Sequence, residues 1–393
     1  MVGTGISVYA SRYFSKDDAH HFWPIWLFLL AALNALFLSA DLFNLYITLE
    51  LMGLAAVALS ALSGGREALA GAARYLFVSL SGSLAYLLGV VLLYHAFGSL
   101  DIATLAGRIT SEPTAWAALT LMSVGLLLKT ALFPLHFWLP SVHTGAPSPV
   151  SAVLSALVVK ASFYIFLRLW IMLFGPFAGD GVATLLGGMG IAAIIWGSVQ
   201  ALRQTRVKLL VAYSTVAQIG YLFLAFPLAT TAAWGGAAIL ILSHALAKSA
   251  MFLTAGNLLH FGGHDRIVDL DRVVQRLPLS AFAFALAGVS LMGLPPSGGF
   301  IGKWLLLESA LAQGRWVITV VILLGGLLTA AYIFKVLGRS FTQAEVTHQP
   351  RTVPARMEWV ALMLACGAIL MGFVATPLLS LLEIGTPFNG SQS

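Results

Sequence analysis

The sequence predicts an all-α, polytopic membrane protein, and three observations support this fold class. Of its 393 residues, 59% are hydrophobic and only 9% are charged, and the mean hydropathy is +0.93, more than a soluble core requires. The apolar residues gather in runs long enough to cross a bilayer as helices. Proline and glycine interrupt two of these runs, which is typical of the discontinuous helices of transporters.

About eleven apolar runs reach the length of a spanning helix, roughly 17–25 residues. The segment 1–21 precedes them; it is short and polar, so we expect no cleavable signal peptide. The runs cover 22–40, 42–62, 74–97, 115–140, 149–174, 182–202, 207–226, 232–256, 279–312, 316–338 and 357–382.

The order of these runs predicts two repeats followed by a C-terminal helix. The first repeat covers 22–174 and contains the break at 115–140. The second, inverted repeat covers 182–338 and contains the break at 279–312, and a transmembrane helix and tail fill 357–393. The two breaks lie five helices apart, a spacing typical of an inverted five-helix repeat.

The net charge of +6 comes from basic residues spread over short loops, which indicates membrane topology rather than nucleic-acid binding. Of the 21 Lys and Arg residues, fourteen, including Lys208, fall on one side, three on the other and four inside spans. The side with fourteen is therefore expected in the cytoplasm. This predicts a multi-pass protein of the inner (plasma) membrane with its C-terminus outside. The loop 260–276 mixes charges of both signs and is expected to be solvated.

Motifs for cofactor or metal chemistry are missing from the sequence. The single cysteine, Cys366, excludes a disulfide within the chain and a Cys-rich metal or iron–sulfur site. Neither GxxxxGK[ST] nor HExxH occurs, and the dispersed Lys, Glu and His residues do not form the ring of like groups that a channel uses. We expect no cofactor, no bound metal and no redox centre.

Two lysines lie inside apolar runs on either side of the first break. Both lie in the segment 125–160, GLLLKTALFPLHFWLPSVHTGAPSPVSAVLSALVVK, and the prolines between Lys129 and Lys160 interrupt the helix. A lysine at the centre of a spanning helix costs about 2.5–3.5 kcal/mol, so such residues normally face a polar interior and indicate function. Broken backbone at this depth must be buried in protein or line a cavity.

This segment resembles one family, the antiporter-like proton-translocating subunits shared by Mrp-type sodium/proton antiporters, as D-like subunits, and respiratory complex I. The block PLHFWLPSVHTGAPSPVSA, placed between lysines 31 residues apart, carries the resemblance. It implies that Lys129 and Lys160 move protons, and that the spans correspond to family helices 4 to 14. The family's first two helices and most of its third would then be lacking.

The stretch DLFNLYITLE resembles the fifth-helix motif of the family, which implies that Glu50 pairs with Lys129. An unpaired carboxylate among apolar neighbours would be neutral. The pair would hold a proton on the lysine when the acid is near and release it when the acid moves away. A static ion pair that fixes two helices is the alternative. Asp41 is expected at a helix start, where its charge suits the helix dipole.

Three further bases complete the candidate relay. His244 and Lys248 lie at i and i+4 in ILSHALAKSAMFLTAGNLLH and so share one helix face; a structural histidine is the alternative. Lys303 follows the second break, MGLPPSGGFIGK, and resembles the family residue at the end of the proton path. For Lys160, snorkelling to the membrane interface is the alternative to a relay role.

The predicted function is that of a proton-translocating, antiporter-like subunit of an Mrp-type cation/proton antiporter. The alternative is a proton-pumping subunit of a complex I-like or hydrogenase-linked NADH:quinone oxidoreductase, in which catalysis belongs to other chains, so enzyme activity stays open; a scaffolding subunit is a third possibility. Expected partners are other membrane subunits, the lipid bilayer and protons, with sodium or another monovalent cation left open, and no nucleic acid.

Overall fold

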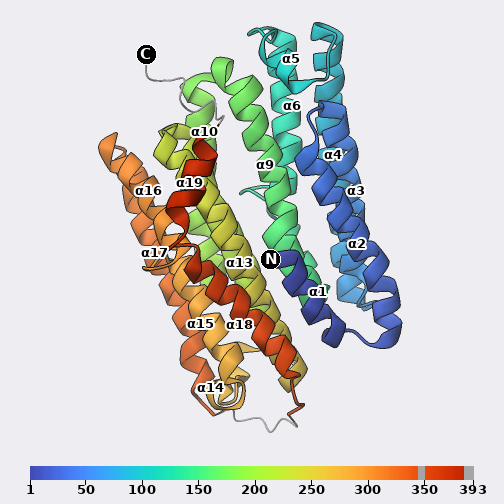
Figure 1. Ribbon diagram of the computed structural model, residues 1–393, viewed down its shortest axis with the longest axis vertical. Helices are drawn as coiled ribbons and strands as arrows, with labels where there is room; N and C mark the ends of the chain where they lie inside the picture. Colours follow the sequence, from blue (N-terminus) through green and yellow to red (C-terminus); the bar gives the residue numbers. More distant parts are fainter. Residues whose placement is uncertain (344–349, 385–393) are drawn as a thin grey trace. The chain divides into compact units, whose positions relative to one another are not determined.

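The computed structural model describes residues 1–343 and 350–384, and helices dominate this part of the chain (Figure 1). The all-α prediction is therefore confirmed. The α-helices are α1 Val2–Tyr13, α2 Lys16–Leu38, α3 Leu42–Ala61, α4 Arg66–Phe97, α5 Ile102–Ala106, α6 Pro113–Thr130, α7 Leu139–Gly145, α8 Ser148–Val153, α9 Val159–Leu169, α10 Gly175–Arg203, α11 Val207–Phe223, α12 Ala225–Leu228, α13 Thr231–Gly262, α14 Val273–Arg276, α15 Pro278–Met292, α16 Gly298–Ala312, α17 Trp316–Ser340, α18 Ala355–Leu370 and α19 Ala375–Glu383. Two π-helical turns, η1 Leu154–Val158 and η2 Trp170–Phe174, and one 3₁₀ turn, η3 Ile267–Asp269, join them.

The chain divides into two compact units. The smaller unit comprises Asp17–Ala146 and Leu157–Leu185. The larger comprises Met1–Lys16, Pro147–Ala156 and the chain from Leu186 onward. The predicted repeats, 22–174 and 182–338, stay a prediction.

In the smaller unit, glycines let α4 and α6 approach backbone to backbone. A Cβ on Gly125 would collide with the carbonyl oxygen of Gly82, and one on Gly89 would collide with the side chain of Met122. Small residues at such crossings are typical of membrane helices, where close packing replaces the hydrophobic driving force. Figure 1 shows α3 and α4 side by side in this unit.

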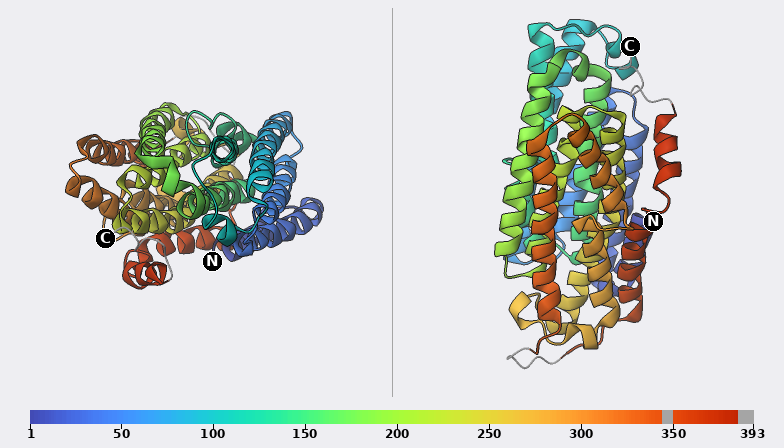
Figure 2. Two further views of the ribbon diagram at one scale, coloured as in Figure 1. Left: turned by 90° about the horizontal axis from the view of Figure 1, so that it is seen from above. Right: turned by 90° about the vertical axis from the view of Figure 1, so that its left-hand side faces the viewer.

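In the larger unit, α13 is the central helix and packs against α8, α11, α15, α16 and α18. Its buried residues lie on all sides, which is expected of a helix that is apolar all round. At its crossing with α16, a Cβ on Gly236 would lie 2.8 Å from the carbonyl oxygen of Gly302. In end-on view most of the yellow and orange helices of this unit appear as rings, so their axes run roughly parallel (Figure 2).

Both predicted helix breaks are present. The first follows α6, where Ala131 takes the left-handed conformation with φ of 59°. The second follows α15, where Gly293 does so with φ of 82°, a conformation that glycine adopts without strain. Each break contains a cis peptide bond before proline, at Pro134 and at Pro296.

The predicted count of about eleven spans is not confirmed. Within the described residues, seven helices are long and apolar enough to span a membrane, or eight if α18 and α19, bent by 69°, form one span. Halves of broken helices are too short to count, α15 and α16 having 15 residues each. The continuous stretch Ser148–Arg203 counts once, although 56 helical residues would extend about 84 Å. Gly179, with φ of 67° and ψ of −179°, interrupts its helical geometry.

Large apolar side chains stay exposed along several of the long helices. Leu27, Phe77, Leu84, Leu327 and Phe334 are examples, each more than half exposed. Apolar surface of this extent is rare on soluble monomers but suits contact with lipid. The chain is therefore a multi-span membrane protein.

Two helix starts are capped by aspartates that lie beside each other. The Asp41 carboxylate accepts hydrogen bonds from the backbone N–H groups of Phe43 and Asn44, so the predicted position of Asp41 at a helix start is confirmed. Asp101 caps α5 by accepting from the N–H and the hydroxyl of Thr104, both at 2.7 Å. These hydrogen bonds lower the pKa of Asp101.

Candidate functional site

The smaller unit contains a buried ion pair beside the first break. Lys129 lies in the last turn of α6 and is 4% exposed; its Nζ is 3.7 Å from the Glu50 carboxylate on α3. The ammonium also donates to the Ser79 hydroxyl on α4 at 2.9 Å, and the Ser83 hydroxyl donates to Glu50. Three helices thus place one base, one acid and two hydroxyls together, as the predicted pairing requires. The roles of Glu50 and Lys129 in transport stay a prediction.

Glycines provide the room for the Lys129 side chain. A Cβ added to Gly53 on α3 would lie 2.5 Å from Ser79 Oγ and 3.4 Å from Lys129 Nζ. A Cβ on Gly82 would lie 3.3 Å from Lys129 Cγ. Because Gly53 and Gly82 have no side chains, the Lys129 side chain has room to reach Ser79 and Glu50.

Lys160 belongs to the same unit and follows the π-helical turn η1. It lies in the first turn of α9 and is 5% exposed. A π-helical segment inside a spanning helix is often found at a functional site. Its burial does not fit a side chain that extends to the membrane interface, although its relay role stays a prediction.

In the larger unit, His244 and Lys248 are both buried on α13, one helical turn apart. Lys248 Nζ donates to the backbone carbonyl of Val211 on α11 at 2.9 Å and to the hydroxyl of Ser214. Helix α11 therefore supplies polar groups for this lysine. The burial of both residues is consistent with the prediction that His244 and Lys248 lie on one face of this helix.

Lys303, 6% exposed, lies on α16 just after the second break. Its Nζ donates to the carbonyl of Leu291 at 2.6 Å and contacts that of Met292 at 3.5 Å. It also lies 4.2 Å from the ring centroid of Tyr221, within cation–π range. The last carbonyls of a helix have no partner within it and form the negative end of its dipole. The carbonyls at the C-terminal end of α15 therefore stabilise the Lys303 ammonium. The Lys129 ammonium, in contrast, is stabilised by a carboxylate.

Polar side chains on α11 and α17 were missed by the sequence analysis. The Gln218 amide donates to the carbonyl of Leu291 at 3.3 Å and is 3.5 Å from the Thr329 hydroxyl, and the Tyr332 hydroxyl is 3.3 Å from that of Thr329. Ser214, Gln218 and Tyr221 recur at intervals of four and three residues along α11. This spacing places polar groups on one face of an apolar helix. It was the feature of the sequence from which these residues could have been predicted.

Another buried base, Lys208, was counted as a loop residue. It lies in the first turn of α11 and is buried near Asp265, which is 1% exposed. Asp265 pairs with Arg206 at 2.8 Å and accepts from the backbone N–H of Lys208 at 2.9 Å. The cluster of Arg203, Arg206 and Lys208 at the start of an apolar helix was the sequence feature that could have indicated a buried base here.

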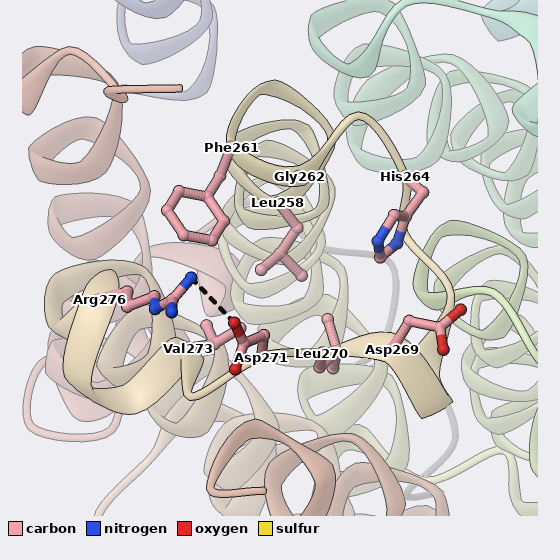
Figure 3. Close-up of a pocket in the computed structure, with 9 residues that line it drawn as sticks. All are labelled: Leu258, Phe261, Gly262, His264, Asp269, Leu270, Asp271, Val273 and Arg276. Atoms are coloured by element: carbon pink, nitrogen blue, oxygen red, sulfur yellow. Dashed lines mark ion pairs between the residues drawn. The ribbon is translucent and has the colours of Figure 1, made fainter. Parts of the chain in front are cut away.

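The expectation that loop 260–276 is solvated is wrong in part. Besides Asp265, its apolar residues Ile267, Leu270 and Val273 are buried, because the loop folds back onto the chain. A cavity of about 10 Å³ lies under it, and the Asp271–Arg276 ion pair, at 2.8 Å, lies at its edge (Figure 3). This cavity is too small for a ligand larger than about one water molecule.

The six predicted residues fall into two groups, each within one unit. The smaller unit holds the first three and the larger unit the rest: Glu50, Lys129 and Lys160, then His244, Lys248 and Lys303. Across residues 1–343 and 350–384, no group of three or more His, Cys, Asp or Glu residues is placed to hold a metal ion.

Comparisons with known proteins show the family and the fold of the chain. The protein family that matches residues 39–329 is described as NADH:quinone oxidoreductase/Mrp antiporter, TM. The chain is 36% identical to NADH-quinone oxidoreductase subunit N of Desulforudis audaxviator, covering 96% of this chain and 79% of that protein. It is 29% identical to the D subunit of the Na(+)/H(+) antiporter of Alkalihalophilus pseudofirmus, covering 93% and 75%. A chain of the Mrp complex from Dietzia sp. DQ12-45-1b superposes with a TM-score of 0.87 at 24% identity, covering 97% and 80%.

Proposed function

Because the chain belongs to the NADH:quinone oxidoreductase/Mrp antiporter transmembrane family, we propose that it is a proton-translocating, antiporter-like subunit of an Mrp-type cation/proton antiporter. Protons would pass along the buried bases and acid of the two units. The likeness to the D subunit of a Na(+)/H(+) antiporter supports the Mrp assignment. The partners are then other membrane subunits.

The observation that carries this proposal is the buried Glu50–Lys129 pair beside a broken helix. Glu50 is 17% exposed, so the pair retains a limited route to the surroundings while Lys129 is almost fully enclosed. Proximity of the carboxylate favours the ammonium form, and separation favours the amine form because burial disfavours charge. A small movement of α3 or α6 would therefore load or unload a proton at this position.

The chemistry at each lysine is a simple proton transfer. Lys129 carries its proton while Glu50 accepts hydrogen bonds from Ser83 and faces the ammonium. When the pair opens, an N–H bond of the ammonium breaks and the proton moves to the next base, which gains a positive charge. Ionisable side chains that pair with one another inside the membrane are typical of proton relays.

A second candidate function is supported by the 36% identity to an NADH-quinone oxidoreductase subunit N. In a complex I-like or hydrogenase-linked assembly, the same residues would pump protons while other chains carry out the redox reaction. Purification of the native assembly separates the two candidates: flavin and iron–sulfur proteins among the co-purified subunits would favour the respiratory complex, and small membrane subunits alone the antiporter.

The test of proton translocation itself compares Lys129→Met with Lys16→Met in inverted vesicles that contain the native assembly. Lys16 is exposed and serves as the matched control. We expect Lys129→Met to abolish proton movement, monitored with a pH-sensitive dye, while assembly is retained. Normal proton movement in that variant would contradict the proposal.

We also propose an orientation of the chain in the membrane. The fourteen-to-three distribution of Lys and Arg supports a plasma-membrane protein with its basic loops in the cytoplasm and its C-terminus outside. A reporter fused after the C-terminus should be active only outside the cytoplasm. The opposite result would reverse the orientation without affecting the relay residues.

A further inference from the structure

A seam of polar side chains connects two of the lysines in the larger unit. We use "the seam" for Ser214 and Gln218 on α11 together with Thr329 and Tyr332 on α17, all of which are buried. Lys248 lies at one end of the seam and Lys303 at the other. The helices α11 and α17 are neighbours in this unit.

The Lys248 end begins at a hydroxyl. The Lys248 ammonium donates to Ser214, and the Ser214 hydroxyl in turn lies 2.9 Å from the carbonyl of Val211. The Tyr332 hydroxyl donates to the Thr329 hydroxyl at 3.3 Å, and the side chains of Ser214 and Gln218 lie near it. Tyr332 thus lies between the hydroxyl that receives Lys248 and the Thr329 hydroxyl, which the Gln218 amide approaches at 3.5 Å.

The Lys303 end is a shared carbonyl. Gln218 Nε2 and Lys303 Nζ both donate to the backbone oxygen of Leu291, at 3.3 Å and 2.6 Å. That oxygen belongs to the last turn of α15, where the second break leaves carbonyls without helical partners. Gln218 therefore holds in place the group that receives the Lys303 ammonium.

Lys248 and Lys303 contact α11 at different positions along its axis. Ser214 and Tyr221, whose ring lies under Lys303, are seven residues apart on α11, which corresponds to about 10 Å along the axis. Two ammonium groups at such a distance cannot exchange a proton directly, because proton transfer needs hydrogen-bond contact at each step. Intervening hydroxyl groups supply these contacts.

We propose that the seam is the path by which a proton passes between Lys248 and Lys303, with Tyr332 as the relay hydroxyl and Gln218 as a positioning residue. This inference rests on the proposed function and names the side chains that carry out one segment of it. An amide does not exchange its own proton readily, so Gln218 orients the Leu291 carbonyl while the proton moves through hydroxyl groups.

The transfer balances as a series of O–H and N–H exchanges. An N–H bond of Lys248 breaks as Ser214 gains that proton and gives its own to Tyr332. Tyr332 gives its proton to Thr329, and one water molecule takes the proton released by Thr329 and delivers it to the amine of Lys303. The net result is a neutral Lys248, a charged Lys303 and unchanged hydroxyl groups, which then rotate back.

The test uses substitutions that remove one hydroxyl and little else. Tyr332→Phe keeps the ring that fills the core, and Thr329→Val keeps the size of the side chain. In the native assembly reconstituted into vesicles, each should slow proton transport by about 100-fold, the lower end of what a positioned proton-transfer group contributes. Thr329→Ser restores the hydroxyl and should transport at nearly the wild-type rate.

Two control variants remove buried hydroxyl groups outside the seam. Ser340, also on α17, donates to Val336 in its own helix, and Tyr86 contacts the carbonyl of Leu42 at 3.3 Å. Ser340→Ala and Tyr86→Phe should leave the initial rate unchanged. Rates of Tyr332→Phe and Thr329→Val equal to these controls would overturn the inference.

The pH profile supplies a readout that a purely structural role would not change. Gln218→Glu places an ionisable group against the carbonyl shared with Lys303, and its anion would favour the ammonium form. Proton release from Lys303 should then require a higher pH, so the rate profile shifts toward alkaline pH. An unshifted profile would exclude Gln218 as a positioning residue.

Failure of the inference and failure of the proposed function give different results. Lys303→Met should abolish transport if the relay exists at all. Loss in Lys303→Met together with normal rates in the seam variants would reject only the seam as the path. Normal transport in Lys303→Met would reject the relay itself.

Discussion

At the scale of single residues, Lys129 and Lys303 are stabilised by different kinds of partner. Lys129 faces a carboxylate, whereas Lys303 faces two carbonyls and an aromatic ring. A carboxylate can change its own protonation state, and a carbonyl cannot. The first site is therefore suited to switching, and the second to holding a proton that arrives from elsewhere.

Glu50→Gln removes the charge that faces Lys129 but keeps an oxygen for the Ser83 hydroxyl. We expect proton transport to fall by about 100-fold, in the range of a positioned acid or base, with normal assembly. Ser83→Ala leaves the charge and removes one hydrogen bond, so its effect should be at most about tenfold. Initial rates in vesicles check both, and equal rates for Glu50→Gln and wild type would favour a purely structural ion pair.

Gly53→Ala tests the space beside Lys129. The added methyl group would lie 2.5 Å from Ser79 Oγ and displace the Ser79 hydroxyl from the ammonium. Crowding of this kind costs about 1–3 kcal/mol, so both the melting temperature and the transport rate should fall. Gly188→Ala is the matched control, because no atom lies within 4 Å of its added Cβ. Identical melting curves for the two variants would contradict the packing around Lys129.

At the scale of secondary-structure elements, proline and glycine located the two breaks correctly, but their chemistry could not be predicted. At the first break the indole of Trp138 donates to the Leu128 carbonyl at 2.9 Å. At the second, the Leu291 carbonyl stays available and binds Lys303 and Gln218. Which group occupies a freed carbonyl depends on packing between distant segments, and a local pattern does not contain that information.

The aspartate cap of α5 predicts an acid-dependent contribution to stability. Hydrogen bonds from Thr104 lower the pKa of Asp101 in the folded state. The cap therefore stabilises the fold fully above the ordinary carboxyl pKa of about 3.9, and this contribution is lost as the pH falls through the lower, folded value. Melting temperatures of wild type and Asp101→Ala should differ at neutral pH and converge in acid. A constant difference across this pH range would contradict the role of the charge.

At the scale of the whole molecule, the sequence predicted the fold class, the buried positions and the pairing of Glu50 with Lys129. It did not reveal the buried Lys208 or the seam, because serine, threonine, glutamine and tyrosine are common in membrane helices and acquire meaning only from their neighbours. The predicted number of spans is not confirmed, since continuous and broken helices do not follow apolar runs one to one.

Under the proposed function, the bases of the two units would act as one proton path in series. A path in series fails when any single member is removed, whereas two independent paths fail together only when both are interrupted. Glu50 in the smaller unit and Lys303 in the larger unit are the appropriate members to remove, because each lies beside one of the two helix breaks.

The most direct measurement is the initial rate of proton uptake by vesicles containing the native assembly, compared for wild type, Glu50→Gln, Lys303→Met and the double variant at equal protein levels. We expect either single substitution to lower the rate to near background and the double variant to be no slower. Substantial uptake in both single variants, lost only in the double variant, would contradict a single path.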